Sequence, residues 1–136
     1  MHVAAQWLVG EHDFTSFRGA GCQSNTPFRR VHRIAVHRTG PLVVVDVTAN
    51  AFLMHMVRNI CAALWQVGCG RRPAGWLADL LAARDRRYTG PTAPPQGLYL
   101  VDVCYPEHDL PAGMAPGLLR SLGSLAVAFE GRFRSG

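Results

Sequence analysis

The chain has 136 residues, of which 49% are hydrophobic and 17% are charged, and its formal net charge is +5. This composition is typical of one globular domain and excludes a disordered chain, and no apolar run reaches the ~18 residues that a membrane span needs. Lysine is absent, so all 14 side chains counted as Lys or Arg are arginines. Because guanidinium groups bind phosphate bidentately, this basic balance makes nucleic acid a candidate partner.

The cysteines and the first residues indicate the compartment. The chain has four cysteines and no Cys-x-x-Cys pair among Cys22, Cys61, Cys69 and Cys104. We expect buried thiols in a reducing compartment and neither a zinc site nor disulfides. Residues 1–10 lack the basic segment and the cleavage site of a signal peptide, so we expect a cytoplasmic location.

The first half of the chain predicts one helix end and a hairpin. Residues 3–9 are consistent with the end of a helix that Gly10 closes. Apolar and polar residues alternate over residues 31–38, and residues 42–48 are rich in valine. With the Thr-Gly-Pro turn at residues 39–41 between them, these segments predict two antiparallel strands.

The second half predicts two helices, a strand and a tail. Residues 52–67 have helical apolar spacing on most sides, which favours a central helix, and residues 74–83 predict a second one. Residues 98–105 predict a third strand. The order α-β-β-α-α-β predicts an α+β fold with helices packed on a mostly antiparallel sheet. Residues 1–109 are expected to form one folded unit, and residues 110–136 a tail that is disordered or a loose helix.

Arg58 lies in an almost wholly apolar stretch, A-N-A-F-L-M-H-M-V-R-N-I, at residues 49–60. No acidic residue occurs between Asp46 and Asp79, yet a buried arginine without a counter-charge costs several kcal/mol. We therefore expect Asp46 or Asp102, an anionic group of a ligand, or a carboxylate of another chain or domain as its partner. A partly exposed Arg58 with its stem along the surface is a further alternative.

Other polar residues have both a functional and a structural interpretation. Four arginines cluster in the loop and first strand: Arg18, Arg29, Arg30 and Arg33. They either contact nucleic-acid phosphates or form a solvated face. His55, one helical turn before Arg58, either lines a cleft or is a satisfied core residue. The Glu-His-Asp run at residues 11–13 is not expected to bind metal, because consecutive loop side chains diverge and no second cluster completes a site.

Several longer motifs carry a resemblance to a known family. They are G-E-H-D-F-T-S-F-R (10–18), C-Q-S (22–24), P-F-R-R-V (27–31), the stretch at 49–60, R-D-R (84–86) and T-A-P-P-Q-G-L-Y-L (92–100). In this order they resemble the C-terminal half of the tRNA pseudouridine synthase A family, over about residues 1–109. The resemblance implies one half of a two-lobed fold. It also implies that residues 1–10 match an internal helix, so that Met1 is not the usual start.

The resemblance implies an isomerase that converts uridine to pseudouridine in the tRNA anticodon stem-loop, at positions 38–40. In this family an aspartate nucleophile acts on a flipped-out base without metal or organic cofactor. That aspartate lies in an Arg-Thr-Asp-Ala-Gly motif of the N-terminal half, and a tyrosine works beside it. Neither the Arg-Thr-Asp-Ala-Gly motif nor the motif of that tyrosine occurs in these 136 residues. The family also implies a homodimer.

Two residues carry over from the family's active site. Arg58 matches the arginine that pairs with the nucleophilic aspartate, and a cation there would keep that aspartate ionised. Leu98 matches the apolar residue that packs on the target base. The expected substrate-binding set is Leu98, His55, Arg18, Arg29 and Arg30.

Three interpretations follow for the chain as a whole. The first is that it supplies the arginine-bearing half of the active site, is inactive alone and requires an N-terminal half. The second is a non-catalytic RNA-binding or dimerisation module. The third is a truncated product with an unsatisfied sheet edge, which would aggregate or misfold.

Overall fold

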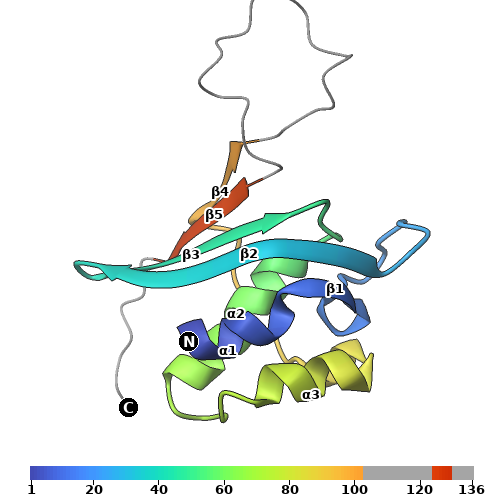
Figure 1. The fold of residues 1–136 in the computed structure, drawn as a ribbon, viewed down its shortest axis with the longest axis horizontal. Helices are drawn as coiled ribbons and strands as arrows, with labels where there is room; N and C mark the ends of the chain where they lie inside the picture. Colours follow the sequence, from blue (N-terminus) through green and yellow to red (C-terminus); the bar gives the residue numbers. More distant parts are fainter. Residues whose placement is uncertain (103–123, 130–136) are drawn as a thin grey trace, which may run out of the picture.

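The computed structural model describes residues 1–102 and 124–129. The strands are β1 (Gly10–Asp13), β2 (Phe28–Thr39), β3 (Leu42–Ala49), β4 (Leu98–Asp102) and β5 (Ser124–Phe129). The helices are α1 (His2–Ala5), α2 (Met56–Gly68) and α3 (Trp76–Ala83), and three short 3-10 turns are η1 (Gln6–Leu8), η2 (Thr15–Phe17) and η3 (Arg86–Tyr88). The helices lie against one face of the sheet (Figure 1). The expected α+β fold with helices packed on an antiparallel sheet is therefore confirmed.

The predicted hairpin is confirmed. β2 and β3 pair antiparallel, and the pairing ends where Thr39 lies opposite Leu42. The connection is Gly40, with a φ of +59°, followed by Pro41. Glycine with a positive φ at the first central position gives a two-residue turn whose twist matches that of the strands, and proline suits the next position. The turn that the sequence predicts at residues 39–41 is thus the turn that connects β2 and β3.

The sheet has five strands, in the order β1-β2-β3-β5-β4, whereas the sequence predicts three. β1 comes from a segment expected to be a loop. Its residues G-E-H-D show no apolar alternation, so periodicity does not reveal it. β1 is a strand because its backbone pairs with the first residues of β2, from Gly10 opposite Val31 to Asp13 opposite Phe28.

The expectation of a disordered or helical tail is wrong for Ser124–Phe129, which forms β5. This short apolar run, S-L-A-V-A-F, is compatible with a helix or a strand from sequence alone. In the structure it lies between β3 and β4 and pairs with both, which removes two exposed strand edges. Residues 103–123 and 130–136 lie outside the described part, so the domain boundary at residue 109 stays a prediction.

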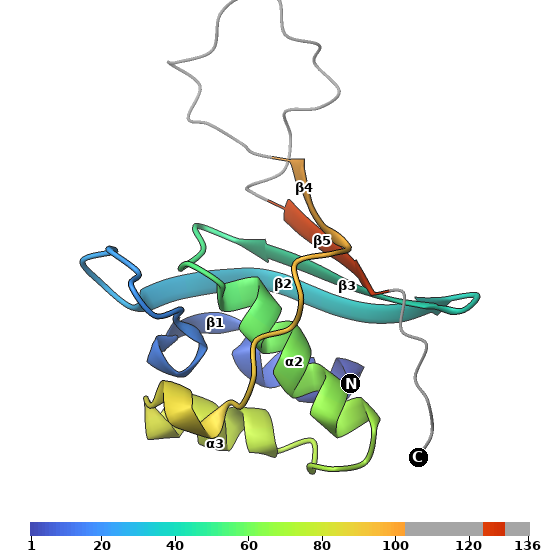
Figure 2. The ribbon, with the colours of Figure 1, turned by 180° about the vertical axis from the view of Figure 1, so that it is seen from behind.

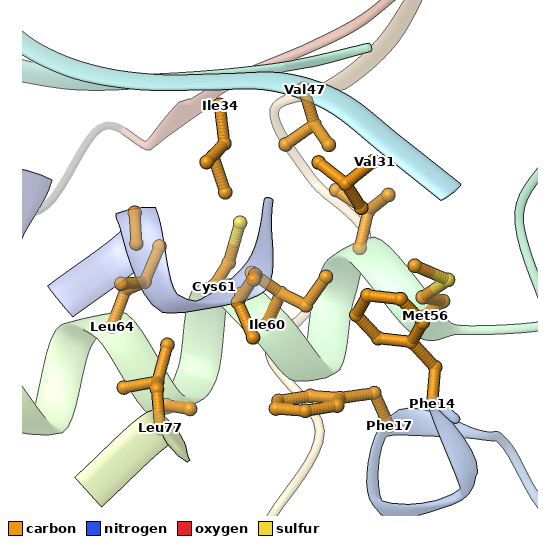
Figure 3. Packing of buried hydrophobic residues seen from close by; sticks show 14 of the residues in the cluster. Phe14, Phe17, Val31, Ile34, Val47, Met56, Ile60, Cys61, Leu64 and Leu77 are labelled. Atoms are coloured by element: carbon orange, nitrogen blue, oxygen red, sulfur yellow. The ribbon is translucent and has the colours of Figure 1, made fainter. Parts of the chain in front are cut away.

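The core lies between the sheet and the helices, and α2 runs through it. Met56, Ile60 and Leu64 recur every four residues on α2 and are fully buried. Figure 3 shows the side chains of α2 between Ile34 of the sheet on one side and Leu77 of α3 on the other. The central helix that the sequence predicts is therefore confirmed, but its predicted start at residue 52 is wrong, because the helix begins at Met56 after the left-handed His55.

The described cysteines, Cys22, Cys61 and Cys69, are free thiols. Cys61 is buried on α2, and this burial raises the pKa of its thiol. Cys69 is exposed because α2 ends at Gly68 just before it. The expectation of buried thiols is thus confirmed for Cys61 and wrong for Cys69, while Cys104 lies outside the described residues.

Candidate active site

Arg58 lies in the first turn of α2, beside the segment that leads from η3 to β4. Figure 2 shows this segment crossing α2 on its way to the sheet. The Nε of Arg58 donates a hydrogen bond of 2.8 Å to the carbonyl oxygen of Ala93 in this segment. Ala93 is buried and Arg58 is partly buried. The contact fixes the plane of the guanidinium, because Nε is the nitrogen next to the aliphatic stem.

The charge of Arg58 is not neutralised within the part of the chain that the structure describes. The ion pairs found there are Arg30–Glu11, Arg84–Asp13 and Arg87–Asp85. The expected ion pair between Asp46 and Arg58 is not among them. The side chain of Asp102 is not among those that the structure describes. No hydrogen-bond acceptor among the described residues meets the terminal nitrogens of Arg58.

The residue after Arg58 holds the same segment from inside the core. Asn59 is fully buried, and its Nδ2 donates to the carbonyl oxygen of Phe17 at 2.8 Å. Its Oδ1 accepts from Arg86 Nη2 at 2.9 Å and from Thr92 Oγ1 at 2.8 Å. The sequence alone does not predict this network, although an asparagine on the buried face of an apolar helix is a signal, since buried amides require partners.

Arg86 completes the network with neutral acceptors. Its Nη1 donates to the carbonyl oxygen of Gly90 at 2.6 Å, and its Nη2 reaches Thr92 Oγ1 at 2.8 Å. Burial lowers the pKa of Arg86. The neighbouring Asp85 pairs with Arg87 instead, whose hydrogen bonds hold the pKa of that carboxyl below its usual range. Arg86 is therefore a structural side chain that joins the two ends of a turn.

His55 and Arg18 lie where a long loop packs against the start of α2. His55 is exposed and has a φ of +59°, and the amide of Gly19 donates to the carbonyl oxygen of Met54 at 2.7 Å. Arg18 Nη2 donates to the carbonyl oxygens of Cys22 and Ser24 at 2.9 Å and 2.7 Å. Arg18 thus organises this loop, and the roles of Arg18 and His55 in substrate binding stay predictions.

We expect Gly19→Ala to lower the free energy of unfolding by ~1–3 kcal/mol, as overpacking does. A Cβ on Gly19 would lie 2.9 Å from the backbone oxygen of Met54 and 2.9 Å from Nδ1 of His55. The backbone atom cannot rotate away, so the loop or the start of α2 must shift. Urea unfolding of the variant measures the loss.

The matched control is Gly75→Ala. Gly75 has a φ of −71°, and an added Cβ there would meet no atom within 4 Å. Its substitution is expected to change the free energy of unfolding by less than ~1 kcal/mol. Equal losses in the two variants would show that the contact between the loop and α2 is not tight.

Arg29 and Arg30 do not act as one cluster. Consecutive residues of a strand point to opposite faces, so Arg29 lies on the face of β2 that carries buried Val31, and Arg30 on the other. Arg29 donates to Ser24 Oγ and to the carbonyl oxygens of Thr26 and Phe28. Arg30 is exposed and pairs with Glu11 at 3.2 Å. Of the two, Arg30 has the more open guanidinium, and the expected phosphate contacts stay predictions.

Leu98 is the first residue of β4 and follows the segment that Arg58 contacts. It is partly buried and packs against the core cluster. Its amide donates to the carbonyl oxygen of Pro95 at 3.2 Å, which closes the turn before the strand. Only four residues, 94–97, separate Leu98 from Ala93, which Arg58 contacts. The packing of Leu98 on a base stays a prediction.

The side chains of the Glu-His-Asp run at residues 11–13 make hydrogen bonds and ion pairs with other residues of the fold. Asp13 accepts from the backbone and the hydroxyl of Thr15 and pairs with Arg84, and His12 bonds to the carbonyl oxygen of Val9. Over residues 1–102 and 124–129, no group of three His, Cys, Asp or Glu side chains is arranged to hold a metal ion. Within the same ranges, no helix has the length and apolar character for crossing a bilayer.

The fold and the site define an α+β module with a partly buried arginine that forms no ion pair among the described residues. A family model described as "tRNA pseudouridine synthase" matches residues 4–106. The chain therefore belongs to the tRNA pseudouridine synthase family, and the resemblance drawn from its motifs is confirmed.

Curated relatives agree with this assignment. The chain is 62% identical over 107 residues to the "tRNA pseudouridine synthase A" of Shewanella amazonensis. It is 60% identical over 108 residues to the protein of that name from Shewanella frigidimarina, and 61% over 108 residues to the one from Shewanella loihica. Each match covers 79% of this chain and 41% of the relative. The chain thus spans well under half the length of these relatives.

Proposed function

We propose that this chain supplies the arginine-bearing half of the active site of a tRNA pseudouridine synthase. Arg58 would pair with the nucleophilic aspartate of the other half, and Leu98 would pack on the target uracil. The substrate would be uridine in the anticodon stem-loop of tRNA, bound in part by His55, Arg18, Arg29 and Arg30.

The observation that carries this proposal is the state of Arg58. Its Nε is held by the carbonyl oxygen of Ala93, whereas none of the ion pairs of the described residues involves its charge. A carboxylate bound to the terminal nitrogens would be oriented by two parallel hydrogen bonds and would stay ionised near neutral pH. Those are the properties that a carboxylate nucleophile requires.

The reaction would be a rearrangement of one nucleoside. The bond from the ribose to N1 of uracil breaks, the freed base turns, and a bond from the same ribose carbon to C5 forms. The proton that leaves C5 is balanced by the one that N1 gains, so no atom is added or removed. The chemistry therefore needs a nucleophile, a flipped-out base and a site that retains the base, and it needs no cofactor.

The test is pseudouridine formation in a tRNA anticodon arm. The purified chain is assayed alone and after mixing with the part of the Shewanella amazonensis enzyme that its match does not cover. We expect no turnover by the chain alone, because these 136 residues lack the aspartate motif, and turnover in the mixture. Turnover by the chain alone would contradict the role assigned to the other half.

A tRNA-binding measurement distinguishes the second interpretation, a non-catalytic module, from the proposed function. A non-catalytic RNA-binding module would bind tRNA with an affinity that falls steeply as salt rises, and would show no turnover in any mixture. The homodimer and the cytoplasmic location stay predictions. A sedimentation measurement on the purified chain tests the first of them.

A further inference from the structure

The hydroxyl of Thr92 is a donor and an acceptor at once. It donates to Asn59 Oδ1 at 2.8 Å, and it accepts from Arg86 Nη2 at 2.8 Å. A hydroxyl can make both bonds, whereas a methyl group of nearly the same size can make neither. Thr92 therefore ties the segment before β4 both to α2 and to η3.

The next residue along the chain contacts the catalytic candidate. The carbonyl oxygen of Ala93 accepts the hydrogen bond from Arg58 Nε. Arg58 and Asn59 are consecutive on α2, and they bind the consecutive residues Ala93 and Thr92. The two contacts form a short antiparallel ladder between α2 and the segment, so displacement of Thr92 would displace the carbonyl that orients Arg58.

Arg86 fixes the other end of the same turn. It donates to the carbonyl oxygen of Gly90, and Gly90 has a φ of +85°, a conformation that side chains other than glycine rarely adopt. The turn is thus held at Gly90 and at Thr92 by one guanidinium. A long arginine side chain such as that of Arg58 loses rotamer freedom when it binds, and a preformed anchor for Nε reduces what remains to be lost.

We propose that Thr92 is a positioning residue for Arg58, acting through the carbonyl oxygen of Ala93, with Asn59 and Arg86 as its fixed partners. This inference rests on the proposed function for its catalytic meaning. The geometry on which it depends is measurable in the chain without turnover.

The test compares Thr92→Val, which removes the hydroxyl, with Thr92→Ser, which keeps it. The first readout is solvent exchange of the Arg58 Nε–H proton in an NMR spectrum of the full chain. We expect exchange to be ~10-fold faster in Thr92→Val, as for the loss of one net hydrogen bond, and unchanged in Thr92→Ser. Equal exchange in the wild type and Thr92→Val would overturn the proposal.

The second readout is turnover in the mixture that contains the other half. We expect kcat to fall ~10-fold in Thr92→Val with KM for tRNA nearly unchanged, and kcat in Thr92→Ser to stay near that of the wild type. A rise in KM for tRNA with an unchanged kcat would also overturn a positioning role. Changed exchange together with no turnover in the wild-type mixture would support the role of Thr92 and contradict the proposed function instead.

Arg86→Lys provides a second variant in case Thr92→Val does not fold. It keeps the charge but loses the fork that reaches both Gly90 and Thr92. The matched control is Arg87→Lys on the same turn, because Arg87 is exposed and binds only Asp85 among the described residues. Faster Arg58 Nε–H exchange is expected in Arg86→Lys and not in Arg87→Lys, and the reverse result or no difference would overturn the proposal.

Discussion

Arg58→Ala is expected to lower the rate of pseudouridine formation by at least ~10²-fold in the mixture that contains the other half, the scale for loss of one preorganised charged donor. The substitution removes the cation that would keep the nucleophilic carboxylate ionised and the fork that would orient it. The fold should survive, because Arg58 is only partly buried and makes one hydrogen bond within the described residues. Single-turnover kinetics on an anticodon arm measure the rate.

Arg58→Lys separates charge from geometry. Lysine keeps the positive charge but lacks Nε–H, so it cannot bind the carbonyl oxygen of Ala93 and a carboxylate with the same geometry. We expect a rate between those of the wild type and Arg58→Ala. Arg38→Ala is the control, because Arg38 is an exposed arginine at the end of β2 and has no ion pair among the described residues. If Arg38→Ala were as slow as Arg58→Ala, the loss would reflect overall charge and not the site.

The elements that the sequence predicts correctly are those with a strong local pattern. The hairpin follows from alternation and from the Gly40–Pro41 turn, and α2 follows from apolar residues at helical spacing. β1 and β5 could not be predicted in this way. β1 is polar and is defined by its pairing with β2, and β5 is a short apolar run whose state depends on the edges of β3 and β4.

The residues of the candidate site also differ in whether the sequence reveals them. Arg58 is recognisable from sequence because a charge in an apolar stretch without nearby acids requires an explanation, and because its motif matches a family. Its supporting residues are not recognisable, since Asn59 meets Arg86 and Thr92 across 27 and 33 residues of chain. Contacts at such separation are fixed by the path of the segment over α2, and that path exists only after the core has formed.

Asn59→Leu is expected to lower the free energy of unfolding by about 3 kcal/mol, since it leaves a buried carbonyl and part of a partly buried guanidinium without partners. Leucine has a similar volume, so the loss comes from hydrogen bonding more than from a cavity. The carbonyl oxygen of Phe17 loses its donor, and Arg86 Nη2 and Thr92 Oγ1 lose their shared acceptor. Urea unfolding followed by circular dichroism measures the change.

Asn25→Leu makes the same chemical change at an exposed loop position. It should alter the free energy of unfolding by no more than ~0.5 kcal/mol. Asn59→Asp should lie between the two, because one carboxylate oxygen keeps the contact with Arg86 while the other faces the carbonyl oxygen of Phe17 without a proton to donate. Equal stability of Asn59→Leu and Asn25→Leu would mean that water replaces the lost partners, and the segment that holds Arg58 would then depend on Arg86 and Thr92 alone.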